Sequence, residues 1–79
     1  MERNELLNWA IKGLEYEIIS LDTQINLDKQ QIKRVEKGYV KIDGIIIAKL
    51  RKNIETNLAL IDELERKLFA LKFERDLND

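Results

Sequence analysis

The chain has 79 residues, 14 basic and 15 acidic side chains and a formal net charge of −1, and it contains no Cys, His or Pro. At this length we expect one domain with a small core, without disulfides and without the usual ligands of a transition-metal site. Imidazole bases, thiol nucleophiles and phosphate-binding glycine loops are absent, so we expect no enzymatic activity, no cofactor and no bound metal.

The first predicted element is a long helix over residues 3–37, because apolar residues recur there with spacings of three and four. Its heptad a positions are Ile11, Ile18, Ile25, Ile32 and Tyr39, and its d positions are Leu7, Leu14, Leu21, Asp28 and Val35. Gly13 lies inside this stretch. One alternative is therefore that the helix breaks at Gly13 and the N-terminal segment folds back as a third helix.

Residues 38–43 form the predicted connector. Gly38 follows the periodic run directly and suits the C′ position, where a left-handed residue is needed. Asp43 is placed to cap the next helix, with Ile42 and Ile47 as a hydrophobic staple. The alternative is a short β-hairpin, in which residues 39–42 and 45–47 flank a turn at Asp43 and Gly44.

The second predicted helix covers residues 44–76. Its a positions are Ile47, Ile54, Ile61 and Leu68, and its d positions are Leu50, Asn57, Leu64 and Leu71. Two helices of similar length with a short connector predict an all-α fold, an antiparallel two-helix coiled-coil hairpin that forms a single domain over residues 1–79. We expect this hairpin to dimerise into a four-helix bundle.

Two polar residues interrupt the apolar stretch at matching heights. If the chain folds back near Lys41, Asp28 and Asn57 fall in adjacent layers of the seam between the helices. We therefore expect a buried polar pair that weakens the seam but fixes its register. The alternative is that both side chains face solvent at a loosely packed place.

Several large apolar side chains lie outside the seam, near the two termini. They are Leu6, Trp9, Tyr16, Phe69 and Phe73. Because Trp and Tyr are frequent in binding hot spots, this group predicts an interface, either with a second copy of the chain or with another protein. The alternative is scattered exposure of these side chains without an interface.

Charge is also unevenly distributed. Residues 29–52 carry a net charge of +6, whereas residues 1–28 carry −4 and residues 53–79 carry −3. The predicted basic tip at the connector end consists of Lys33, Arg34, Lys37, Lys41, Lys49, Arg51 and Lys52. Such a tip is suited to phosphates or to an acidic protein surface, but no nucleic-acid recognition motif accompanies it.

Together these features predict a non-catalytic protein–protein interaction module, such as a small adaptor, regulator or stoichiometric inhibitor of the kind that phages and mobile elements encode. The alternatives are a nucleic-acid-binding protein that uses the basic tip, and a structural coiled-coil element of a larger assembly. We expect a homo-oligomer, with a dimer favoured. No uninterrupted apolar run is longer than four residues, the length of Ile45 to Ala48, so we expect a cytoplasmic location and no membrane contact.

Overall fold

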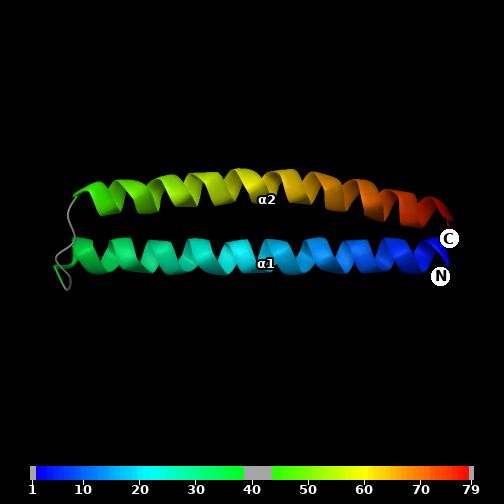
Figure 1. Ribbon diagram of the computed structural model, residues 1–79, viewed down its shortest axis with the longest axis horizontal. Coiled ribbons are helices and arrows are strands. Elements are labelled where there is room, and N and C mark those ends of the chain that lie inside the picture. Colours follow the sequence, from blue (N-terminus) through cyan, green and yellow to red (C-terminus); the bar gives the residue numbers. More distant parts are fainter. Residues whose placement is uncertain (1, 39–43, 79) are drawn as a thin grey trace.

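The protein is a rod made of two antiparallel helices. The computed structural model describes residues 2–38 and 44–78, and within these ranges it contains α1 (Arg3–Glu36) and α2 (Gly44–Asn78). Figure 1 shows the helices side by side, with both termini at one end. The Cα atoms extend over 54 × 16 × 16 Å. The predicted all-helical two-helix hairpin is confirmed.

α1 continues through Gly13 without a break, so the alternative with a third helix is wrong. A Cβ atom added at Gly13 would meet no atom within 4 Å, so close packing does not require glycine here. Glycine inside a helix costs about 1 kcal/mol relative to alanine. Seam contacts of Ile11 and Leu14 on either side of Gly13 offset this cost, because the apolar repeat runs through the glycine unchanged.

Gly38 ends α1 as the sequence predicts. Its φ of 78° lies in the left-handed region, and its backbone N–H donates to the carbonyl of Val35 at 3.0 Å. The predicted cap Asp43 and the staple residue Ile42 lie outside the described residues, as do Tyr39 and Lys41. Residues 45–47 belong to α2, so the second strand of the β-hairpin alternative is wrong.

The seam consists of the predicted a and d positions. Each of these positions that the structure describes is buried or half-buried, and nearly every other described side chain is exposed. The buried apolar side chains are Leu7, Ile11, Ile25 and Leu64. Full burial of such a side chain contributes about 1.5–3 kcal/mol. The hairpin is therefore held together by one narrow apolar stripe.

Polar contacts at both ends of the rod support the antiparallel register. At the end with the termini, Arg3 pairs with Glu74, and Arg75 Nη1 donates to Asn8 Oδ1 at 3.2 Å. At the connector end, Arg51 Nη2 lies 3.8 Å from Glu36 Oε1. Exposed pairs of this kind each contribute less than about 1 kcal/mol, so they adjust the register and the seam provides the stability.

Neither helix, over the residues described, has a stretch long and apolar enough to cross a membrane.

Candidate functional site

The hairpin has two long sides, one on each flank of the seam. Antiparallel pairing puts the e and b positions of both helices on one side and the g and c positions on the other. Contacts agree with this assignment: Arg51 and Glu36, which form an ion pair, both occupy e positions. Ala10 and Lys67, which line one groove, both occupy g positions.

The two sides differ in charge. Among the twenty positions that each side has within α1 and α2, the e and b side has thirteen charged residues and the g and c side has seven. We call them the charge-rich side and the charge-poor side. The apolar residues of the charge-poor side are Leu6, Ala10, Leu27, Ile46, Leu60, Ala70 and Leu77. Those of the charge-rich side are Ile19, Ala48, Leu58 and Phe69.

An apolar groove of about 480 Å³ lies on the charge-poor side, towards the end with the termini. Its floor is formed by Leu14 and Leu71 of the seam, and the small side chains Ala10 and Ala70 leave it open. Lys67 and Glu74 flank it. Because it is shallow and lined by methyl groups, it is suited to an apolar side chain of another helix and offers no group for chemistry.

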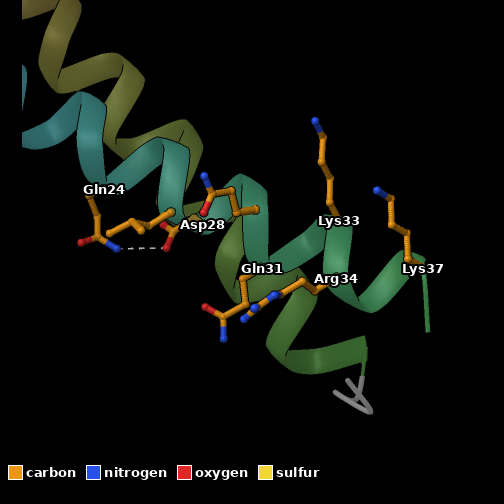
Figure 2. Close-up of a pocket in the computed structure, with 8 residues that line it drawn as sticks. Gln24, Asp28, Gln31, Lys33, Arg34 and Lys37 are labelled. Atoms are coloured by element: carbon orange, nitrogen blue, oxygen red, sulfur yellow. Dashed lines mark hydrogen bonds between the residues drawn. The ribbon is translucent and has the colours of Figure 1, made fainter. Parts of the chain in front are cut away.

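A second, more polar groove of about 910 Å³ lies nearer the connector. Asp28, only 5% exposed, lines it, and its Oδ1 accepts a hydrogen bond from Gln24 Nε2 at 3.0 Å. Figure 2 shows this contact, with Gln31 and Arg34 further along the same face. The other carboxylate oxygen of Asp28, Oδ2, is buried without a hydrogen-bond partner in the part of the chain described.

The predicted polar pair thus differs in detail from the structure. Asp28 is buried and Asn57 is half-buried, so both belong to the seam. The hydrogen bond to Asp28, however, comes from Gln24, four residues earlier on the same helix. The sequence contained this signal, because Gln–Asp pairs spaced by four residues face one another on a helix.

The predicted aromatic interface falls on two different faces. Trp9 and Tyr16 occupy f positions of α1, opposite the seam, and are 66% and 73% exposed. Phe69 and Phe73, 72% and 58% exposed, occupy the outer part of α2. Leu6 is exposed on the charge-poor side. All five lie near the termini, but the outer faces of the two helices point away from each other, so a single flat surface cannot cover them all.

The described residues of the basic tip also point in several directions. Figure 2 shows Lys33 and Lys37 projecting away from the face where Gln31 and Arg34 lie. On α2, Lys49, Arg51 and Lys52 point in three different directions around the helix, at c, e and f. The described basic residues of this tip therefore surround the rod with positive charge and do not form one cradle for a phosphate.

The described residues contain no group of three or more Asp, Glu, His or Cys side chains that could hold a metal ion. The acidic residues of α2 instead form helix-stabilising pairs, including Arg66 with Asp62 at 2.9 Å and Lys67 with Glu63 at 3.8 Å. Two features are not among the residues predicted from the sequence, namely the hydrogen bond from Gln24 and the groove at Ala10 and Ala70. Both are on the charge-poor side.

Comparisons with protein-family models, with curated proteins and with solved structures find no match to this chain.

Proposed function

We propose that the chain is a non-catalytic protein-interaction module that dimerises into a four-helix bundle and binds another protein through its outer aromatic side chains. The observation that carries this proposal is the exposure of Trp9, Tyr16, Phe69 and Phe73 outside the seam. Large aromatic side chains contribute most to binding when a partner desolvates them. An adaptor, regulator or stoichiometric inhibitor acts in this way, by occupying a surface of its partner.

The surface area supports dimerisation. The hairpin exposes 6316 Å², whereas a compact monomer of 9.4 kDa exposes about 5,000 Å². Burial against a second hairpin removes part of this excess and surrounds the seam with more apolar contacts. Such burial also stabilises the hairpin beyond what the narrow apolar seam provides alone.

The test of partner binding is capture from a lysate of cells that express the protein, with two variants compared by quantitative mass spectrometry. We expect the unaltered chain and Leu58→Ala to retain the same protein in stoichiometric amounts. Trp9→Ala combined with Phe69→Ala should lose it while keeping the solution mass. Leu58 is the control because it is also exposed but lies in the middle of the rod. Equal retention by all three proteins would contradict the proposal.

The second candidate function is binding of nucleic acid by the basic tip, favoured by the net charge of +6 over residues 29–52. Phosphate contacts make affinity fall steeply with salt. Fluorescence anisotropy with labelled single- and double-stranded oligonucleotides distinguishes the two functions. A steep salt dependence that becomes shallower after Lys33→Ala, Arg34→Ala and Lys37→Ala supports nucleic-acid binding, and the absence of binding at low salt excludes it.

A further inference from the structure

We infer that the charge-poor side is the dimer interface, and that the second copy docks on it in antiparallel orientation, with its basic tip beside the acidic end of the first. This inference rests on the dimerisation proposed above and adds the side, the orientation and the contacts. The twofold axis lies across the middle of the rod, near Ser20 of α1 and Ile61 of α2. Each helix then packs against its own counterpart.

The choice of side follows from desolvation. Charged side chains lose hydration when a second hairpin covers them, and the charge-poor side has seven charged positions against thirteen on the other. It also holds the apolar groove, whose small side chains Ala10 and Ala70 allow another helix to approach closely. The Cα extents of 54 and 16 Å give one long face about 860 Å², close to the roughly 800 Å² that each partner buries in a standard interface.

The orientation follows from the charges at the two ends. A second copy in the same direction would bring two basic tips together, each with a net charge of +6 over residues 29–52. In the antiparallel orientation each basic tip lies beside residues from the two negative segments, which carry −4 and −3. Complementary ends attract and like ends repel, so the charges select the antiparallel dimer.

In the antiparallel orientation, apolar side chains on the charge-poor side of one copy lie opposite small or apolar residues of the other copy. Leu27 lies seven residues from Ser20 towards the connector, and Gly13 lies seven residues from it towards the termini. A twofold axis at Ser20 therefore places Leu27 of one copy over Gly13 and the apolar groove of the other. On α2, Ile46 and Leu77 lie at nearly equal distances from Ile61 and meet in the same way.

The buried side chain of Asp28 independently favours this side and this orientation. Its unpartnered Oδ2 belongs to a side chain that is 95% buried and lines the polar groove on the charge-poor side. An unpaired buried carboxylate oxygen carries an energetic cost unless a donor reaches it. Asp28 lies eight residues from Ser20, and Lys67 lies six residues from Ile61 on the opposite half. The axis thus brings Lys67 of the second copy to within about 3 Å of the height of Asp28 along the rod.

Two matched variants test which long side forms the dimer interface. Leu60 on the charge-poor side and Leu58 on the charge-rich side are 42% and 50% exposed and lie two residues apart on α2. Leu60→Glu places two carboxylates near the axis, so we expect the dimer dissociation constant, measured by light scattering or sedimentation, to rise at least about 30-fold. Leu58→Glu should leave it within about threefold. Helicity by circular dichroism confirms that both variants fold. The opposite pattern, or equal effects, overturns the choice of side.

Crosslinking tests the orientation. The chain has no Cys, so Ile46→Cys and Leu77→Cys each carry one thiol, and the two proteins are mixed and oxidised. We expect mainly the mixed disulfide between positions 46 and 77. Disulfides that join two copies of the same variant at higher yield overturn the antiparallel arrangement. An unaltered chain that remains monomeric overturns this inference together with the proposed dimer, but leaves the aromatic capture test to decide partner binding.

Discussion

The two long sides of the hairpin are built from the same pair of helices and flank the same seam, yet they present different surfaces. The charge-rich side has charge at most of its positions, and its apolar residues are scattered. The charge-poor side has an apolar groove towards the termini and, nearer the connector, a polar groove lined by the buried carboxylate of Asp28. The a and d positions form the seam of the hairpin, whereas the flanking e, b, g and c positions give its two sides their different charge and apolar content.

The seam orients both long sides of the hairpin, so we expect the largest effect from weakening the seam. Ile25→Ala deletes the most buried apolar side chain and should lower the free energy of unfolding by about 2–5 kcal/mol. Ile19→Ala, at an exposed position of the charge-rich side, should change it by less than about 0.5 kcal/mol. Urea unfolding followed by circular dichroism at one protein concentration measures both. Equal losses would contradict the single-seam account.

Gln24 lies on the charge-poor side and contacts the buried side chain of Asp28. Gln24→Ala removes the hydrogen bond to the buried carboxylate of Asp28 and should cost about 1–3 kcal/mol of unfolding free energy. Gln31→Ala is the control, since Gln31 occupies the equivalent position one heptad later and lines the same groove. Urea unfolding followed by circular dichroism measures the free energy of unfolding of both variants. A cost for Gln31→Ala as large as that for Gln24→Ala would show that the contact to Asp28 is unimportant.

The salt dependence of dimerisation tests whether the basic end of one copy lies beside the acidic end of the other. If basic and acidic ends lie side by side in the dimer, raising NaCl from about 50 to about 500 mM screens an attraction and should increase the dimer dissociation constant about two- to tenfold. Sedimentation equilibrium at several salt concentrations measures this. A dissociation constant that falls with salt would mean that like ends are paired.

We expect the smallest change in stability at the outer face of α1, where Trp9 lies. Trp9→Ala should change the unfolding free energy by less than about 0.5 kcal/mol, because Trp9 is largely exposed and contacts Lys12 of its own helix, with Nζ 6.0 Å from the ring centroid. Thermal unfolding by circular dichroism measures this change. A loss above about 1 kcal/mol would place Trp9 in a packed interface already formed by this chain alone.

Much of the fold follows from the sequence pattern. The spacing of Ile and Leu predicts both helices and the seam between them, and Gly38 predicts the end of α1. The sequence does not decide whether the helix breaks at Gly13. A single glycine lowers helix propensity, but it does not show whether contacts of neighbouring residues offset that cost. The three isoleucines at 45–47 favour a strand locally, but Ile47 belongs to the seam of α2.

The candidate site is less predictable from the sequence. Proximity to the termini groups Trp9 and Tyr16 with Phe69 and Phe73, but it does not show that the outer faces of two packed helices diverge. The groove between Ala10 and Ala70 exists only once α1 and α2 are paired in register. Small residues separated by sixty positions give no signal before that pairing is known.

In the proposed dimer, one long side of the hairpin is covered in solution and the other is not. The most direct measurement is the rate at which a thiol reagent labels the single-cysteine variants Leu60→Cys and Leu58→Cys under native conditions, at a protein concentration above the dimer dissociation constant. We predict several-fold slower labelling at position 60 than at position 58, with equal rates after dilution to monomer. Equal rates at both concentrations, or slower labelling at position 58, would contradict the claim.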